Sequence, residues 1–199
     1  MLSRIVIFVL VKIKLALIKW KSPNVMFGPG FTLDMATKIQ VGQNKLSIGE
    51  NVYLRSSSNG YHAGMPFPTT ILVDKNGAEC EIGDNCRING AYLHAQKKIV
   101  VGKNSVIAAG VNIIDSNGHV LNSPNRTCGR DSPGEVIIGE NVWVGLNVII
   151  LKNTTIGDNS VVAAGSVVKG RFPNNALIQG NPAKIIRLLD IENDAGNTR

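Results

Sequence analysis

Proton transfer, nucleophilic attack and metal binding are open to few side chains of this sequence. The histidines and cysteines are His62, His94, His119, Cys80, Cys86 and Cys128. His119 follows Asn117-Gly118 at the start of a polar segment, DSNGHVLNSPNRTCGRDSPGE, whose glycines and prolines predict an exposed loop. A neutral imidazole can accept a proton near neutral pH, so His119 suits a general base presented on a loop.

The other reactive side chains support less chemistry. A zinc site would need three histidines to converge, and these three are far apart in the sequence, so no metal is expected. Cys128 shares the loop of His119 and could form a covalent intermediate, although an inert thiol is the simpler interpretation. An odd number of cysteines without a C-x-x-C spacing indicates a reducing compartment.

The composition describes a packed domain with many turns. Of the 199 residues, 44% are hydrophobic and 18% are charged, which excludes a disordered chain. Aromatic residues make up 5%, so the core is not expected to rest on Phe and Trp. There are 21 Gly and 21 Asn, the residues that best tolerate positive φ, and this number predicts tight turns at regular intervals.

The net charge of +7 is concentrated at the N-terminus. Residues 1–21 hold five basic side chains and no acidic one, so the rest of the chain carries only +2 and is not expected to bind nucleic acid. The longest uncharged run, Ile5–Val11, is far shorter than the roughly 20 residues that span a bilayer. We expect a basic amphipathic helix over residues 1–22. It could pack on the end of the body, make peripheral membrane contact through residues 1–21, or do both.

A short repeat dominates the remainder. The tetrapeptide aliphatic-Gly-x-Asn occurs seven times, at Val41–Asn44, Ile48–Asn51, Ile82–Asn85, Val101–Asn104, Ile138–Asn141, Val144–Asn147 and Ile156–Asn159. Aliphatic residues then recur every six positions, most clearly at Ile138, Val144, Ile150, Ile156, Val162 and Val168. The fifth position of each hexapeptide is small or β-branched.

A period of six fits neither an α-helix nor a plain strand. It fits a coil of three short strands joined by turns, in which Gly-x-Asn supplies the unusual backbone angles and the aliphatic and fifth residues point inward. One coil cannot bury its own face, so several must stack. The period breaks twice, at about Leu54–Cys80 and between Ile114 and Val136, and a functional site is expected where it breaks.

These repeats resemble the left-handed β-helix hexapeptide-repeat acyltransferases, especially the maltose/galactoside acetyltransferases and the O-acetyltransferases of bacterial surface polysaccharides. The resemblance covers about residues 30–190. It implies an all-β, left-handed parallel β-helix with a short N-terminal helix and a short C-terminal helix, assembled as a homotrimer. The implied organisation is a helix at 1–22, an acyltransferase domain at 23–190 with an extruded loop at 115–135, and a flexible tail at 191–199.

The resemblance also suggests roles for individual residues. It makes His119 the general base that takes a proton from the acceptor hydroxyl, with Asp115 and Asn89 as candidates to support it. Leu146 stands where the sugar acetyltransferases have Ser, so backbone N–H groups would stabilise the oxyanion. Residues implied in binding coenzyme A are Trp143, Gly145, Ala163 and Ala164 along the pantetheine arm and Lys169, Arg171, Lys184 and Arg187 near the phosphates.

The expected function is therefore an acetyl-CoA-dependent O-acetyltransferase that acts on a saccharide hydroxyl in bacterial surface polysaccharide biosynthesis. The expected location is the cytoplasm, with contact at the inner face of the membrane through the N-terminal helix. Two alternatives stay open: an N-acetyltransferase of a nucleotide-linked amino sugar, and a non-catalytic hexapeptide scaffold.

Overall fold

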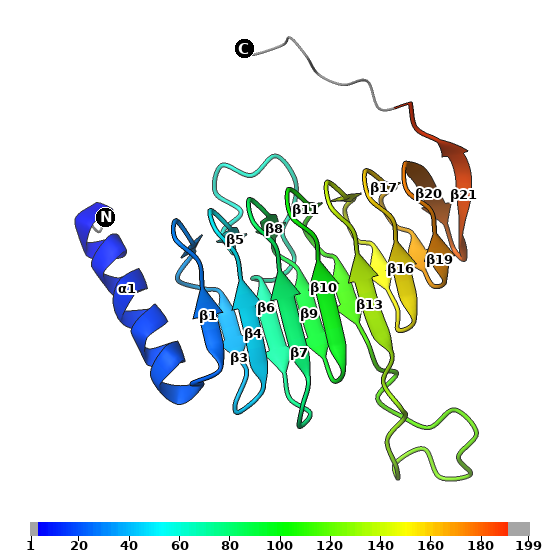
Figure 1. Ribbon diagram of the computed structural model, residues 1–199, viewed down its shortest axis with the longest axis horizontal. Helices are drawn as coiled ribbons and strands as arrows, with labels where there is room; N and C mark the ends of the chain where they lie inside the picture. Colours follow the sequence, from blue (N-terminus) through cyan, green and yellow to red (C-terminus); the bar gives the residue numbers. More distant parts are fainter. Residues whose placement is uncertain (1–3, 191–199) are drawn as a thin grey trace.

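The computed structural model describes residues 4–190, and its strands form three parallel sheets around one axis (Figure 1). Sheet A contains β1 Val25–Phe27, β4 Lys45–Ile48, β7 Glu79–Ile82, β10 Lys98–Val101, β13 Glu135–Ile138, β16 Thr154–Ile156 and β19 Arg171–Phe172. Sheet B contains β2 Thr32–Leu33, β5 Tyr53–Arg55, β8 Arg87–Asn89, β11 Val106–Ile107, β14 Trp143–Val144, β17 Val161–Val162, β20 Ala176–Gly180 and β21 Ala183–Leu188. Sheet C contains β3 Lys38–Gln40, β6 Thr70–Val73, β9 Tyr92–Ala95, β12 Asn112–Ile114, β15 Ile149–Ile150 and β18 Val167–Val168.

Successive strands belong to successive sheets, so the chain winds as a left-handed parallel β-helix. Each strand pairs in parallel with the strand three places later, as β10 does with β13. The predicted fold class is confirmed. The aliphatic residues of the hexapeptides stack on one another inside the coil, and Ile107, Ile113, Ile138 and Ile150 are among the fully buried side chains. The fifth positions, such as Ser105 and Ser160, are also fully buried.

The Gly-x-Asn corners divide the work differently from the prediction. In six of the seven tetrapeptides, the Asn has a left-handed backbone with φ near +60°, whereas the Gly does not. The Gly is needed for close approach instead, since a Cβ on Gly83 would lie 2.5 Å from the backbone nitrogen of Lys103 in the next coil. The exception is the first tetrapeptide, where Gly42 has the positive φ and Asn44 uses its side chain to donate to the Val73 carbonyl at 2.8 Å.

Helix α1, Arg4–Lys21, covers the N-terminal end of the coil (Figure 1). Its Val11, Leu15 and Ile18 pack against the core cluster, and Lys14 donates to the carbonyls of Met35 and Thr37 at 2.7 and 2.5 Å. The helix thus satisfies backbone groups at the open end of the β-helix. Among the described residues, 4–190, no helix is long and apolar enough to cross a bilayer.

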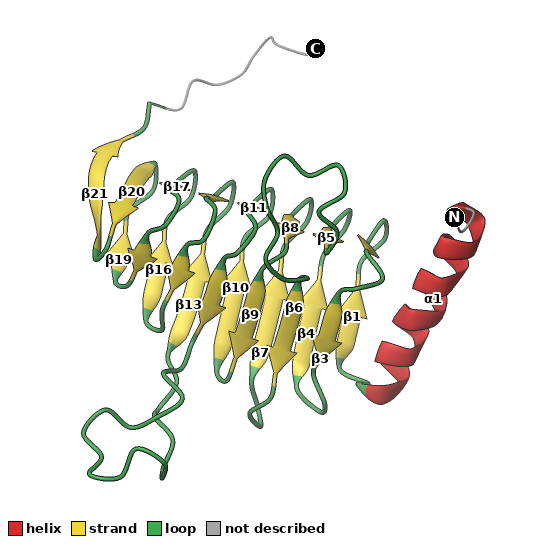
Figure 2. Ribbon diagram, turned by 180° about the vertical axis from the view of Figure 1, so that it is seen from behind, coloured by secondary structure: helices red, strands yellow, loops and turns green. Residues whose placement is uncertain are grey.

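The prediction of a short C-terminal helix is wrong for the described residues. Residues Ala183–Leu188 form β21, which turns back antiparallel on β20 after Gly180-Asn181-Pro182 and closes the other end of sheet B (Figure 2). Pro has no N–H, and Ile185 and Ile186 are β-branched, so the segment favours a hairpin over a helix. The predicted tail at 191–199 lies outside the described residues.

Both interruptions of the repeat are loops. Residues 56–69 connect β5 to β6, and residues 115–134 connect β12 to β13. They leave the coil on opposite sides (Figures 1 and 2). The second loop begins at the corner between sheets C and A, so it emerges opposite sheet B.

Candidate active site

A groove of about 960 Å³ runs across the outer face of sheet B, from β2 to β17. Its floor consists of two rows of outward-facing residues, set by the parallel register of the strands. The first row is Tyr53, Arg87, Val106, Trp143 and Val161. The second row follows two residues later on each strand.

The second row explains the shape of the groove. It begins with Arg55 and Asn89, which are register partners, and continues with Ala108, Gly145 and Ala163. Side chains along this row therefore shrink toward the C-terminal coils, which leaves a trough beside Trp143. A Cβ on Gly145 would lie 2.7 Å from the backbone nitrogen of Ala164, so the trough also needs glycine for close packing of two coils.

The trough brings several predicted residues together. Asn89, Trp143, Gly145, Ala163 and Ala164 all line the groove. The Asn89 side chain is only 7% exposed, and its amide donates to the Ile107 carbonyl at 3.0 Å. Within residues 4–190, its carbonyl oxygen accepts no hydrogen bond. Asn89 can therefore receive a hydrogen bond from a ligand in the groove.

The four predicted cations do not gather within one chain. Lys184 and Arg187 lie on β21 at the C-terminal end of sheet B, where Arg187 is the register partner of Leu177. Arg171 begins β19 on sheet A, and Lys169 lies between β18 and β19. All four side chains are exposed, but only the pair on β21 extends the sheet that carries the groove.

His119 is exposed and does not line the groove. It belongs to the 115–134 loop, which leaves the coil opposite sheet B. Its side chain makes no hydrogen bond or ion pair within the part of the chain that the structure describes. One chain alone therefore does not bring His119 to Asn89 or to the trough.

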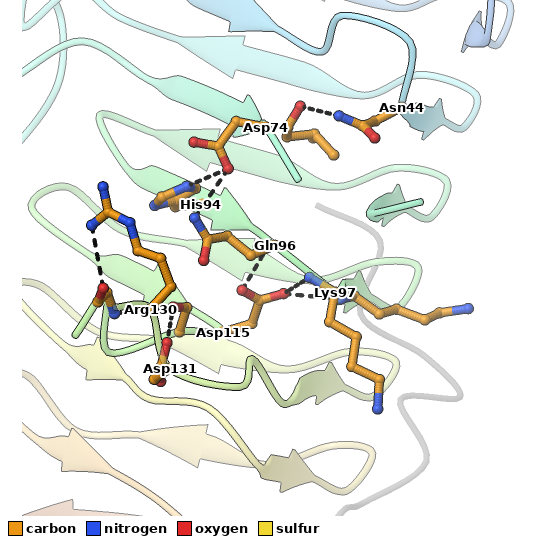
Figure 3. Close-up of polar contacts among 12 residues, drawn as sticks. Asn44, Asp74, His94, Gln96, Lys97, Asp115, Arg130 and Asp131 are labelled. Atoms are coloured by element: carbon orange, nitrogen blue, oxygen red, sulfur yellow. Dashed lines mark hydrogen bonds and ion pairs between the residues drawn. The ribbon is translucent and has the colours of Figure 1, made fainter. Parts of the chain in front are cut away.

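Asp115 is not placed as a partner of His119, which corrects the expectation from the sequence. Its side chain is fully buried, and its carboxylate accepts the backbone N–H groups of Gln96, Lys97 and Lys98 at 2.8, 2.7 and 2.9 Å (Figure 3). Burial raises the pKa of this carboxyl, and the three N–H groups oppose that shift. Asp115 thus secures the corner from which the loop departs.

Asp131 and Lys152 hold the stem of the same loop. The Asp131 side chain, 6% exposed, accepts hydrogen bonds from Ser116 Oγ at 2.5 Å, from the Asn117 N–H at 2.8 Å and from Lys152 Nζ at 2.6 Å. Lys152 also donates to the Ser132 carbonyl at 2.8 Å. Burial alone would raise the pKa of Asp131, but Lys152 and Ser116 lower it to about 2. This pair fixes both strands of the stem, two residues from His119.

Asp131→Asn should loosen that stem. Misplacing a catalytic group by about 1 Å can cost on the order of 100-fold, so we expect kcat to fall by about 10- to 100-fold while the Kd for coenzyme A stays near its original value. Because the pKa is lowered on folding, the stabilisation is complete above the unfolded value near 4 and disappears as pH falls toward 2. Thermal unfolding should therefore separate the variant from the original protein at pH 6 and no longer at the acid end. Glu135→Gln, which removes the exposed pair with Lys97, is the matched control. Equal loss in both variants would contradict a specific role for the stem.

The groove contains residues that the sequence did not single out. Loop 56–69 places Tyr61 and His62 on the groove, with their rings 4.7 Å apart. The only signal was the break itself, since the segment SSSNGYHAGMPFPTT interrupts the repeat. His94 lies elsewhere, on β9 of sheet C, with Nε2 2.9 Å from Asp74 (Figure 3). The described residues contain no group of three or more His, Cys, Asp or Glu that could hold a metal ion.

Similarity to known proteins agrees with this architecture. Residues 135–170 match the bacterial transferase hexapeptide family of six repeats. The chain is 38% identical over 115 residues to galactoside O-acetyltransferase of Escherichia coli, over 57% of this chain and 56% of that protein. It is 38% identical over 122 residues to WbbJ of the same bacterium, named provisionally as a lipopolysaccharide biosynthesis O-acetyl transferase, over 55% of this chain and 60% of that protein. The chain thus spans less than two thirds of these relatives.

Solved structures share the fold over nearly the whole chain. The polySia specific acetyltransferase NeuO superposes with a TM-score of 0.63 at 27% identity, over 89% of this chain and 88% of that one. AntD, an N-acyltransferase from Bacillus cereus in complex with dTDP-4-amino-4,6-dideoxyglucose and coenzyme A, gives a TM-score of 0.68 at 18% identity, over 90% of this chain and 89% of that one. The repeats, the three-sheet coil and these similarities show that the chain belongs to the bacterial transferase hexapeptide-repeat family with the left-handed β-helix fold.

Proposed function

We propose that the protein is an acetyl-CoA-dependent O-acetyltransferase that acts on a saccharide hydroxyl in the biosynthesis of a bacterial surface polysaccharide. The observation that carries this proposal is the groove on sheet B, which joins a narrow trough of small residues to a wider polar and aromatic half. Similarity to galactoside O-acetyltransferase and WbbJ supports the acetyl group and the saccharide acceptor.

The trough fits the extended arm of coenzyme A. Ala108, Gly145 and Ala163 leave room along the floor, and Trp143 forms an apolar wall. Lys184 and Arg187 on β21 would lie toward the phosphates, beyond the C-terminal end of the trough. Among residues 4–190, the N–H groups of Leu146 and Ala164 donate no hydrogen bond, so backbone donors are available where the sugar acetyltransferases use Ser.

The base would come from a neighbouring subunit. His119 leaves the coil opposite the groove, so a complete site requires a second copy whose loop reaches sheet B. A closed ring of three copies provides three such contacts by symmetry. We therefore propose a homotrimer with a shared site, in which Asn89 of one subunit faces His119 of the next.

The residues then suggest direct transfer. His119 takes the proton from the acceptor hydroxyl as that oxygen attacks the acetyl carbonyl carbon. The N–H groups of Leu146 and Ala164 donate to the carbonyl oxygen as it gains negative charge. The carbon–sulfur bond breaks, and His119 returns the proton to the departing sulfur. The acetyl group passes to the acceptor without a covalent enzyme intermediate.

The assay that tests this function follows release of free thiol from acetyl-CoA over a panel of saccharides. Oligosaccharides with free hydroxyls should be acetylated. Amino sugars linked to a nucleotide form the second arm of the panel, since they would reveal N-acetylation. Thiol release that no saccharide or amino sugar stimulates would contradict the proposal and favour the scaffold alternative.

The outer face of α1 supports peripheral membrane contact in addition to its capping role. Phe8 and Trp20 are 62% and 79% exposed, and Lys12 and Lys19 lie on the same helix. Apolar side chains beside lysines suit the interface of an anionic bilayer. This face is separate from Val11, Leu15 and Ile18, which cover the core.

Phe8→Glu combined with Trp20→Glu should weaken binding to vesicles that contain phosphatidylserine by about tenfold or more, since each aromatic side chain gains roughly 1.5–3 kcal/mol on burial. Turnover of soluble acceptors should not change. Cosedimentation with the vesicles measures the effect. Met26→Glu, at an exposed apolar position on β1, is the control. Equal binding by the original protein and the double variant would remove the support for membrane contact.

A further inference from the structure

The N-terminal half of the groove carries two arginines that no acidic side chain neutralises. Arg87 follows Tyr53 in the first row, and Arg55 lies beside Asn89 in the second. From the strand spacing and the rise per residue, their Cα atoms are about 8 Å apart on adjacent strands. No Asp or Glu lines the groove.

The contacts of Arg55 are with uncharged groups. Its guanidinium lies 5.2 Å from the Tyr53 ring centre and 5.8 Å from that of Tyr61, and it donates to the Asn59 carbonyl at 3.3 Å. These contacts orient the side chain without cancelling its charge. Arg87 is exposed, and the described residues provide no ion pair for either arginine.

The neighbouring carboxylate is already committed. Asp34 accepts the Tyr53 hydroxyl at 2.8 Å and the N–H groups of Ser56 and Ser57 at 2.8 and 3.0 Å. It therefore holds Tyr53 and the start of loop 56–69 in place and has both oxygens occupied. The two guanidinium groups keep their donors for a ligand.

These arginines are remote from the proposed phosphate end of the cofactor. Arg87 is three strands from Ala163, about 14 Å, and Arg55 is four strands away, about 19 Å. Lys184 and Arg187 lie beyond Ala163 in the opposite direction. The groove thus has cations at both ends, and the aromatic side chains Tyr53, Tyr61 and His62 surround only the arginine end.

We propose that Arg55 and Arg87 form an acceptor subsite for an anionic group on the saccharide, a sugar carboxylate or a sugar phosphate. Guanidinium groups bind both oxyanions through charge-assisted hydrogen bonds, and the adjacent rings provide an apolar surface for the sugar. The acceptor is therefore an acidic or phosphorylated saccharide. This inference rests on the proposed function, since it assigns the acceptor of the same reaction.

The test compares three acceptor classes of similar size: a glucuronate-containing oligosaccharide, a nucleotide diphosphate glucose and a neutral glucose oligosaccharide. Thiol release gives kcat/KM for each. In the original protein, at least one anionic class should exceed the neutral one by about 10- to 100-fold, and the better class identifies carboxylate or phosphate. Arg87→Gln and Arg55→Gln should each bring that ratio close to 1, mainly through KM of the acceptor, and Arg87→Lys should restore part of it. Lys75→Gln, which removes one exposed charge away from the groove, should keep the ratio.

Several results would overturn the subsite. The selectivity could be absent in the original protein or survive both Gln variants. Alternatively, Arg87→Gln could raise KM for acetyl-CoA instead, which would assign the arginine to the cofactor. If neutral saccharides are acetylated in these cases, the proposed function stands and only the subsite fails. If no acceptor is acetylated, the proposed function fails. Calorimetric titration of the same three saccharides into the original protein and Arg87→Gln then decides the subsite separately.

Discussion

His119→Ala is expected to lower kcat by about 10²- to 10⁴-fold, the range lost when a general base is removed. The side chain is exposed and lines no part of its own groove, so its loss should leave folding and the trough unaffected. The Kd for coenzyme A, measured by calorimetry, should stay near its original value. The pH–rate profile of the original protein should rise through one ionisation, which the variant should lack.

Two further variants make this result specific. Cys128→Ser should retain nearly full turnover, because Cys128 is exposed and lies outside the groove, and no burst of acetyl-enzyme should appear. His62→Ala distinguishes the two histidines near possible acceptors, since His62 lines the groove of its own chain. Loss of turnover in His62→Ala together with a mild effect in His119→Ala would move the base to loop 56–69. Abolished turnover in Cys128→Ser would indicate a covalent route.

Ala163→Phe should abolish cofactor binding. Ala163 forms the floor of the trough at the point where the arm of coenzyme A is proposed to lie, and a phenyl ring there would fill it. We expect affinity for coenzyme A to fall about 100-fold or more, on the order of 3 kcal/mol. The side chain points outward, so the core stack of Val162 and Val168 should be unaffected.

Calorimetry with coenzyme A measures this loss, and the thermal midpoint checks that the variant folds. Thr155→Phe places the same ring at an outward position of β16 on sheet A, outside the groove, and should bind coenzyme A normally. Unchanged affinity in Ala163→Phe would show that the cofactor does not use the trough.

The regular part of the fold was predictable because its signal is local and repeated. Each aliphatic residue six positions after the last, as at Ile138, Val144 and Ile150, must point inward if the coils are to stack, and this alone fixes the register of three sheets. The C-terminal hairpin was not predictable from that signal, since the repeat ends at Pro173 and the antiparallel pairing of β20 with β21 does not follow it.

The candidate site was predictable only where it lies on unbroken repeats. Trp143, Gly145 and Ala163 follow the period, so their shared face could be inferred. Arg55 precedes loop 56–69, whose length hides the phase between Arg55 and Asn89. The role of Asp115 depends on three backbone N–H groups from an earlier coil, and no pattern of side chains announces such contacts.

The central claim is that His119 of one subunit acts on the groove of the next. Mixed trimers of His119→Ala and Ala163→Phe test it, because each variant alone lacks one half of every site. In a random 1:1 mixture, a site is intact when its groove comes from the His119→Ala chain and its histidine from the Ala163→Phe chain, which gives about one quarter of the original activity.

The matched control mixes the original protein with a chain that carries both substitutions, co-refolded at 1:1. A site shared between subunits then needs two original chains and gives about one quarter of full activity, whereas a site within one chain gives about one half. The account predicts one quarter in both mixtures. No activity in the first mixture together with one half in the second would contradict it.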